Sequence, residues 1–194
     1  MIYMIRHGQT ELNSRQVLQG RSDFPLNETG IAQAEEAAAR LRGISFSAVY
    51  SSPLLRAVQT AGIVAPGIAP CMDERLIEMD YGPYEGADLT RLPPEVITFF
   101  SDFVHNPAPA GMEALESVVR RAGAFLESCC RTEENILIST HAIALKGLLE
   151  YLTPESGGAW WSRYIGNCAV YTSAYHNGHF TVPTLMKETK QYDG

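Results

Sequence analysis

The fold is decided by the stretch Met1-Ile2-Tyr3-Met4-Ile5-Arg6-His7-Gly8-Gln9-Thr10. Its first five residues are apolar, which is too short a run for a helix by itself, and a polar Arg-His-Gly break follows. A short apolar run of this kind is typical of a buried strand. Arg6 interrupts the run at a place where an unpaired charge would be costly, so it is harder to explain as a solvated side chain than an arginine on a helix surface.

Downstream of this strand, the pattern alternates between helices and strands. We predict a helix over residues 27–42, capped by the asparagine at its start, and a strand over residues 46–50. The next helix is predicted to carry residues 54–64, with Ser52 as its N-cap and Pro53 at its first position.

The second half of the chain continues the alternation. We predict a helix over residues 112–129, a strand over 136–140, and a further helix after His141. Two antiparallel strands, 169–175 and 180–184, flank an Asn-Gly turn. Strands that alternate with helices favour an α/β fold: a three-layer α/β/α sandwich around a mostly parallel central sheet, with an antiparallel strand near the C-terminus.

The length of 194 residues suits a single domain, 1–194. Within it, residues 87–110 are predicted to form a small helix and loop, and we expect this segment to be a helical cap or lid excursion. Apolar residues make up 45% of the chain, which is enough for a substantial core.

The charge balance argues against one class of partner. The chain has 15 Lys and Arg against 22 Asp and Glu, a net charge of −7. Proteins that bind nucleic acid are more often basic, so no nucleic-acid partner is expected. A small anionic substrate remains compatible with this charge, because a few arginines in a cleft can reverse the local field.

The sequence also predicts the compartment. No apolar stretch approaches the roughly 20 residues needed to cross a bilayer, and Arg6 comes too early for a signal peptide, so no membrane partner is expected. The cysteines show no C-x-x-C spacing and are interpreted as reduced thiols; they are Cys71, Cys129, Cys130 and Cys168. We therefore expect a cytoplasmic protein.

Polar side chains follow the predicted strands. Arg6 and His7 come after the first strand, Arg56 lies one turn into the helix after the second, and His141 follows the strand 136–140. Ligands of open α/β sheets bind at the carboxyl ends of the strands, so these side chains are expected to converge on one crevice. Alone, each histidine would be interpreted as a hydrogen-bonded loop residue and Arg56 as a solvated one; the combination favours a site.

Two arginines and an imidazole suit a phosphoryl group. The guanidinium fork pairs with phosphate oxygens, and phosphoryl transfer requires mainly positioning and charge neutralisation. Backbone N–H groups around Gly8, with Thr10 or a helix start, could bind a further oxygen, and Gly8 would allow close approach of the ligand. A neutral, oriented histidine is a competent nucleophile, but the sequence leaves open which ring nitrogen reacts.

The motif Arg6-His7-Gly8-Gln9-Thr10, followed by Asn13, resembles the R-H-G-[EQ]-[ST] signature of the histidine phosphatase (phosphoglycerate-mutase-like) superfamily. Further motifs that are similar to those of the family occur in the family's order, at residues 26–34, 51–61, 76–86 and 139–141. Together they span nearly the whole predicted catalytic domain. R-H-G alone is a weak match, whereas five motifs in order are a specific one.

The resemblance implies a role for each matching residue. His7 is the nucleophile, and Arg6, Arg56 and His141 hold the phosphoryl oxygens. Glu78 donates a proton to the leaving oxygen and then serves as base for water. Residues implied to bind or border the substrate are Gly8, Thr10, Asn13, Gln19, Gly20 and Ala142. No metal and no cofactor is implied.

Two other carboxylates, Glu74 and Glu85, are weaker candidates for the proton donor. The chain also departs from the family pattern, because Ala142 follows His141 where relatives usually have glycine; we expect only a modest effect on the phosphate pocket.

The resemblance favours hydrolysis of a small phosphorylated metabolite, by an α-ribazole-phosphatase-like or broad-specificity enzyme. Phosphoglycerate-mutase-type transfer is the alternative; it is less favoured because residues 87–110 contribute Arg91 and His105 but no lysine. A non-catalytic phospho-ligand-binding protein and a metal-dependent hydrolase using His7 and His141 are further alternatives. The oligomeric state is left open, with a homodimer as one option.

Overall fold

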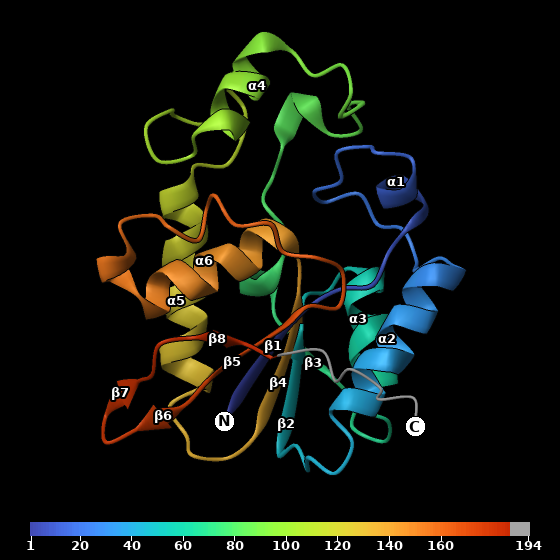
Figure 1. The fold of residues 1–194 in the computed structure, drawn as a ribbon, viewed down its shortest axis with the longest axis vertical. Helices are drawn as coiled ribbons and strands as arrows, with labels where there is room; N and C mark the ends of the chain where they lie inside the picture. Colours follow the sequence, from blue (N-terminus) through green and yellow to red (C-terminus); the bar gives the residue numbers. More distant parts are fainter. Residues whose placement is uncertain (187–194) are drawn as a thin grey trace, which may run out of the picture.

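A six-stranded sheet forms the centre of the structure, a computed structural model that describes residues 1–186 (Figure 1). Its strand order is β3-β2-β4-β1-β5-β8. The strands are β1 (Ile2–Arg6), β2 (Ala48–Ser51), β3 (Cys71–Met72), β4 (Ile136–Thr140), β5 (Val170–Ser173) and β8 (Thr184–Leu185). The first four strands of this order are parallel, whereas β5 runs antiparallel to β1, and β8 antiparallel to β5. The mostly parallel sheet with an antiparallel strand near its C-terminal end is therefore confirmed.

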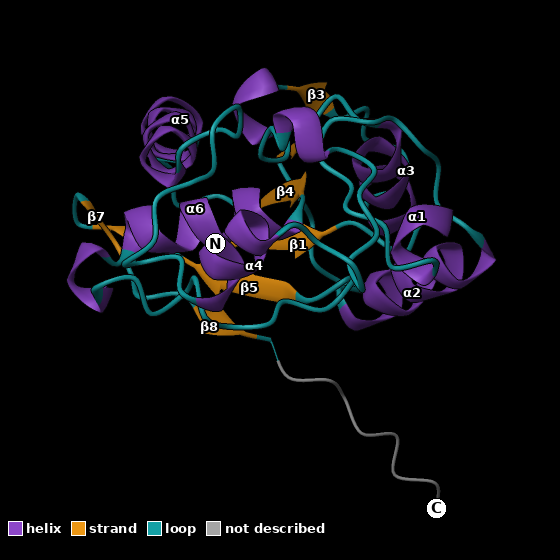
Figure 2. Ribbon diagram, turned by 90° about the horizontal axis from the view of Figure 1, so that it is seen from above, coloured by secondary structure: helices purple, strands orange, loops and turns teal. Residues whose placement is uncertain are grey.

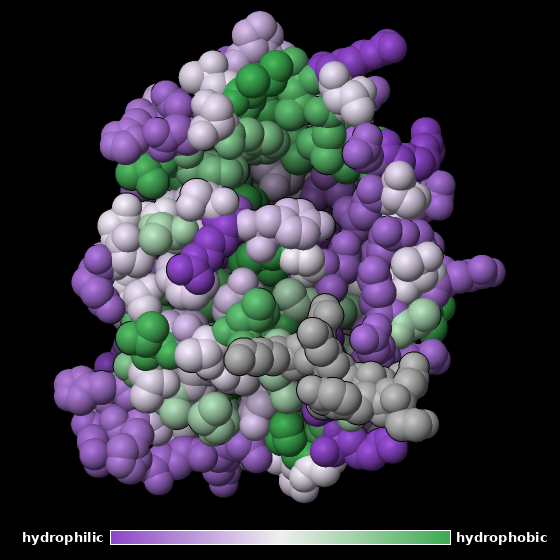
Figure 3. Space-filling model, in the orientation of Figure 1, coloured by the Kyte–Doolittle hydropathy of each residue, from purple (hydrophilic) through white to green (hydrophobic). Residues whose placement is uncertain are grey.

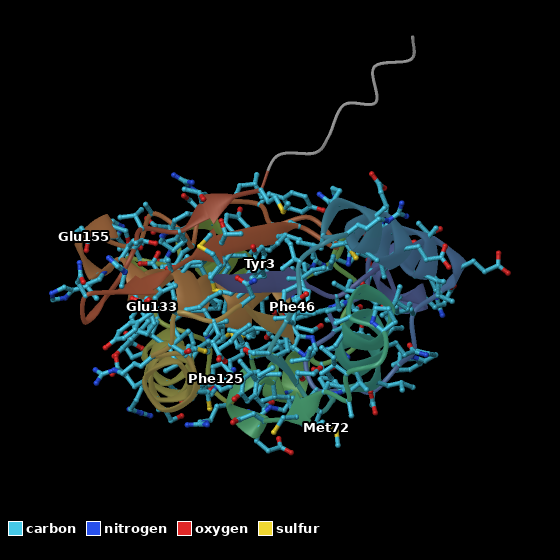
Figure 4. All side chains as sticks on the ribbon, turned by 90° about the horizontal axis from the view of Figure 1, so that it is seen from below. Tyr3, Phe46, Met72, Phe125, Glu133 and Glu155 are labelled. Atoms are coloured by element: carbon cyan, nitrogen blue, oxygen red, sulfur yellow. The ribbon has the colours of Figure 1, made fainter. Side chains whose placement is uncertain are left out.

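Helices cover both faces of this sheet (Figure 2). α2 (Glu28–Arg40) and α3 (Leu55–Val64) lie on one face, and α5 (Leu115–Cys129) and α6 (Ala142–Leu152) lie on the other. The alternation of side chains along β1 explains both layers: Ile2 and Met4 are buried against α5 and α6, and Tyr3 and Ile5 against α2 and α3. Tyr3 and Phe46 lie on one side of the sheet and Phe125 on the other (Figure 4). The α/β/α fold class is thus confirmed.

The start of α3 differs from the prediction. The N-cap residue is Leu54 rather than Ser52, and the helix begins at Leu55. The N–H of Leu55 donates to Asp23 Oδ1 at 2.7 Å, so an acceptor from a distant loop satisfies this helix end. The hydroxyl of Ser52 accepts from the N–H of Leu54 at 3.3 Å and also contacts His141, with 2.7 Å between Oγ and Nε2. The predicted N-cap position is therefore wrong, because the helix begins two residues later than predicted, although Ser52 makes a local bond just before it.

The other helix boundaries lie close to those predicted. Asn27 caps α2 through a hydrogen bond from the Gly30 N–H, as expected. α5 begins at Leu115, three residues later than predicted, and the short helix α1 (Glu11–Ser14) was not predicted. The 3-10 helices are η1 (Glu74–Leu76), η2 (Gly82–Tyr84) and η3 (Pro154–Ser156).

The C-terminal hairpin is shorter than predicted. β6 (Tyr175–His176) and β7 (His179–Phe180) form a two-stranded sheet of their own, and β8 then returns to pair with β5. Asn177 and Gly178 have positive φ values of 52° and 84°, which confirms the Asn-Gly turn.

Residues 87–110 lie beyond the carboxyl ends of the parallel strands and contain α4 (Pro94–Ser101) (Figure 1). Phe99 is buried against Phe100 and Phe103, within a cluster that also contains Tyr81 and Trp161. Apolar side chains also gather over α4 on the molecular surface (Figure 3). These aromatic contacts attach the segment to the rest of the fold, directly above the strand ends. Within the described part of the chain, no helix has the length and hydrophobicity required to span a bilayer.

Candidate active site

The predicted side chains converge at the carboxyl ends of β1, β2 and β4. Arg56 Nε lies 3.3 Å from Nε2 of His7 and 3.2 Å from Nδ1 of His141. The centroids of the two imidazole rings are 5.1 Å apart. Arg56 and His141 are fully buried and His7 nearly so. The strand ends supply the two histidines, and the first turn of α3 supplies the guanidinium between them.

Hydrogen bonding identifies the protonated nitrogen of each ring. His7 Nδ1 lies 2.6 Å from the carbonyl oxygen of Gly8, which can only accept, so Nδ1 carries the proton. His7 Nε2 is then the nitrogen with the lone pair, and it accepts from Arg56. His141 also accepts from Arg56, through Nδ1, so its Nε2 carries the proton and donates to Ser52 Oγ. The nitrogen of His7 that has an available lone pair, which the sequence left open, is therefore Nε2.

The surroundings favour neutral imidazoles. Burial lowers the pKa of His7 well below its usual value, and the charges of Arg56 and Arg6 lower it further. Burial and the charge of Arg56 also lower the pKa of His141. Burial lowers the pKa of Arg56 to about 10, so at neutral pH it is still a cation. A neutral nucleophile and a permanent positive charge are thus adjacent.

Two buried donors close to this cluster have no hydrogen-bond partner among the described residues. Arg6 donates through Nη1 to the Ile165 carbonyl, but its Nε is unpartnered. Gln19 accepts from the Thr10 hydroxyl at 2.7 Å, but its Nε2 is likewise unpartnered. A buried donor left without an acceptor costs about 1–3 kcal/mol, so such groups are suited to the oxygens of a bound ligand.

The backbone N–H groups of residues 8–10 do not serve as predicted. Each already donates to a side chain of the protein; the acceptors are Thr60 Oγ1, Gln33 Oε1 and Asn13 Oδ1. The expectation that these groups bind a ligand oxygen is therefore wrong for this structure. These bonds connect residues 8–10 to Asn13 of α1, Gln33 of α2 and Thr60 of α3.

Gly8 and Asn13 have structural partners. A Cβ atom at Gly8 would lie 2.3 Å from the carbonyl oxygen of Gly30, so the packing of α2 alone requires glycine at this position. Asn13 forms a capping box with Thr10 at the start of α1, which occupies its side-chain oxygen. Any contact of Asn13 with phosphate remains a prediction.

Glu78 lies at the N-terminus of α6. Its Oε1 accepts from the N–H of Ala144 at 2.9 Å and Oε2 from that of Ile143 at 3.1 Å. The N-cap of this helix is His141 and its first residue is Ala142, so the carboxylate, the second histidine and Ala142 share one helix end. Glu78 is nearly fully buried, whereas the weaker candidate Glu74 is exposed in η1. Among the candidate proton donors, the structure thus places Glu78 beside the histidine cluster.

Residues 19 and 20 belong to a loop that is held by the buried arginine. Arg56 Nη2 donates to the Gly20 carbonyl at 2.6 Å, and Nη1 to the Ser22 carbonyl at 2.8 Å. The loop that was expected to border the substrate therefore contacts the guanidinium that was expected to bind phosphate.

Sequence reasoning missed Tyr81 and Arg121. Tyr81 is buried, and its pKa is raised well above the usual value by burial and by the charge of Glu78. Arg121 pairs with Glu113 and donates to the carbonyls of Arg75 and Ile77, which fixes the backbone next to Glu78. Tyr81 could have been proposed from the sequence, because it lies three residues after the candidate Glu78. No motif or spacing near Arg121 indicates that it would contact the same segment.

Known proteins of similar sequence belong to one family. The sequence profile of the histidine phosphatase superfamily (branch 1) matches residues 2–187. Probable phosphoglycerate mutase GpmB of Yersinia pestis (strain Pestoides F) is 35% identical over 158 residues, which cover 78% of this chain and 74% of that protein.

Solved structures of similar fold point in the same direction. Phosphoserine phosphatase of Entamoeba histolytica, in complex with phosphoserine, has a TM-score of 0.83 and 27% identity, covering 98% of this chain and 97% of that one. A structure named as a putative alpha-ribazole-5′-P phosphatase from Escherichia coli K-12 has a TM-score of 0.81 and 26% identity, with 96% of both chains covered. The chain therefore belongs to the histidine phosphatase superfamily (branch 1).

Proposed function

We propose that this protein hydrolyses phosphomonoesters through a phosphohistidine formed on His7. The observation that carries the proposal is the state of His7 Nε2, a buried unprotonated nitrogen that lies 3.3 Å from the guanidinium of Arg56. A neutral imidazole beside a fixed positive charge is suited to attack phosphorus while that charge stabilises the phosphoryl oxygens.

The reaction has two steps. The lone pair of His7 Nε2 forms a bond to phosphorus as the ester P–O bond breaks, and Glu78 protonates the leaving oxygen. A water molecule then attacks the phosphohistidine, Glu78 accepts its proton, and the P–N bond breaks to release phosphate. Arg6, Arg56 and His141 hold the phosphoryl oxygens, and the unpartnered Nε2 of Gln19 is available as a further donor.

The proposed substrate is a small phosphorylated metabolite. The Entamoeba histolytica phosphoserine phosphatase was crystallised with phosphoserine and with 3-phosphoglyceric acid, which have the size and charge that such a site accepts. Residues 87–110 lie over the strand ends and would act as a cap. Hydrolysis is favoured over mutase activity because the cap's Arg91 and His105 are exposed, with His105 paired to Asp102 at 2.7 Å.

Phosphoglycerate-mutase-type transfer is the second candidate, supported by the 35% identity to the GpmB relative. It predicts interconversion of 2- and 3-phosphoglycerate, whereas the hydrolase predicts release of inorganic phosphate. Both products should be measured with the same preparation.

The test is hydrolysis of p-nitrophenyl phosphate in the presence of EDTA, comparing the wild type, His7→Ala and the control His105→Ala. We expect turnover in the wild type and the control, loss of at least about 10³-fold in His7→Ala, and a phosphoenzyme that is labile to acid. Turnover that EDTA abolishes would instead favour a metal-dependent hydrolase. A wild type that binds phosphoserine without any turnover would be a phospho-ligand-binding protein.

A further inference from the structure

Glu85 is surrounded by donors from a single loop. Its carboxylate accepts from the backbone N–H groups of Gly20, Arg21 and Ser22, at 2.9 to 3.3 Å, and from the Ser22 hydroxyl. Among the described residues it forms no salt bridge with a basic side chain. The partners of this negative charge are therefore the peptide N–H dipoles of residues 20–22.

Two of these residues face Arg56 with their carbonyl groups. The carbonyls of Gly20 and Ser22 accept from Nη2 and Nη1 of the guanidinium. The Gly20 carbonyl belongs to the same peptide unit as the Arg21 N–H, which donates to Glu85, so this unit connects the carboxylate to the guanidinium without direct contact between the two. Hydrogen bonds in such a chain polarise one another, so the carboxylate strengthens the Gly20 carbonyl as an acceptor for Arg56.

The loop has little room to adjust. A Cβ atom at Gly20 would lie 2.6 Å from Glu85 Oε2, 2.6 Å from the Met79 carbonyl oxygen and 2.7 Å from the ring of Tyr81. Any shift of the Glu85 carboxylate would therefore move the loop, and with it the two carbonyls that hold the guanidinium plane. Arg56 itself is fully buried, and within residues 1–186 no carboxylate is in hydrogen-bond contact with it that could hold it instead.

We propose that Glu85 is a positioning residue that orients Arg56 for phosphoryl transfer through the loop 20–22, an inference that rests on the proposed function. In this role Glu85 acts as a hydrogen-bond acceptor for the loop, and a comparison of leaving groups distinguishes this role from proton donation. This assignment separates Glu85 from Glu78, although the sequence alone presented both as candidate acids.

The test variant is Glu85→Gln. It keeps the size and shape of the side chain but replaces one acceptor oxygen with an NH₂ donor, which cannot accept from the N–H groups of the loop. Because displacement of a binding group by about 1 Å can cost 10²-fold, we expect kcat to fall by about 10- to 100-fold with a smaller change in KM. The loss should be the same for p-nitrophenyl phosphate and for an alkyl phosphate such as glycerol phosphate, because leaving-group protonation is not affected. Affinity for vanadate, which mimics the pentacoordinate transition state, should fall by a similar factor.

Three controls make the result specific. Glu36→Gln replaces an exposed glutamate of α2 and should behave as the wild type. In an Arg56→Lys background, Glu85→Gln should cause little further loss, because both changes act on the same group. If Glu85→Gln fails to fold, Ser22→Ala removes one of its four partners and should give a smaller loss of the same kind.

Several outcomes would overturn the inference while leaving the proposed function intact. The first is a wild-type kcat in folded Glu85→Gln. The second is a fall in kcat of the same size when Glu85→Gln is added to Arg56→Lys as when it is made in the wild type. The third is a fall in kcat that is much larger for the alkyl phosphate, which would assign proton donation to Glu85. Absence of turnover in the wild type would instead refute the proposed function itself.

Discussion

At the residue scale, Arg56 determines the electrostatics of the site. A buried guanidinium is costly unless its donors are satisfied, and here the acceptors are the carbonyls of Gly20 and Ser22 and the two imidazoles. In the described part of the chain no carboxylate forms a hydrogen bond with Arg56, so its positive charge has no directly paired counter-ion there. The positive charge of Arg56 also lowers the pKa of His7 and His141, so the guanidinium favours the neutral form of both imidazoles.

Replacing Glu78 by glutamine separates its two roles. As the proposed proton donor, Glu78 matters most when the leaving group is a poor one, so we expect kcat to fall by about 10²- to 10⁴-fold for an alkyl phosphate and much less for p-nitrophenyl phosphate. As the acceptor at the start of α6, its replacement should also lower the free energy of unfolding by about 1 kcal/mol, measured by urea titration. Equal losses of kcat for both substrates would contradict the proton-donor role.

At the element scale, helix ends connect distant parts of the chain to the site. α3 is capped by Asp23 and α6 by Glu78, and each helix begins next to a side chain of the cluster, Arg56 or His141. A residue in the first turn of a helix is held more firmly when the end of that helix is satisfied. The caps therefore contribute both to stability and to the placement of the site.

Asp23→Ala removes the acceptor of the Leu55 N–H. We expect the free energy of unfolding to fall by about 1 kcal/mol, the usual effect of losing a helix cap, as measured by urea denaturation. Asp23→Asn keeps an oxygen acceptor and should retain most of the stability. If both variants lose the same amount, the negative charge and not the hydrogen bond stabilises the helix end.

At the scale of the whole molecule, the buried histidines make stability depend on pH. In the folded state the pKa values of His7 and His141 are well below the usual value of 6.5, whereas in the unfolded chain both residues titrate near that value. Below 6.5, and above the lowered folded values, the unfolded state binds more protons than the folded state. The free energy of unfolding must therefore rise with pH in this window.

Each histidine should contribute on the order of 1 kcal/mol of added stability between about pH 5.5 and pH 7.5. Urea titrations at both pH values measure this difference. His7→Gln should remove about half of the pH dependence, and a slope unchanged by this variant would show that His7 titrates normally in the folded protein.

Local sequence patterns predicted some features of this structure correctly and others wrongly. The strand that ends at Arg6, the strand before His141 and the Asn27 cap were predicted because each depends on hydrophobic periodicity or on a side chain within three positions. The Ser52 cap and the free backbone N–H groups around Gly8 were predicted by the same local rules and were wrong. Residues distant in the sequence contribute to both differences, because the Leu55 N–H at the start of α3 donates to Asp23 and the Gly8 N–H donates to Thr60.

By itself the sequence determined the alternating layers, the order of the motifs and the side chains that meet at the strand ends, because apolar periodicity and the parallel sheet leave few alternatives. Only the tertiary structure decided which nitrogen of His7 is left unprotonated, which carboxylate lies at the start of α6 and which one holds the loop beside Arg56. The physical reason is that hydrogen-bond partners join residues 65 to 89 positions apart, and no local pattern encodes which of several distant acceptors a buried donor will reach.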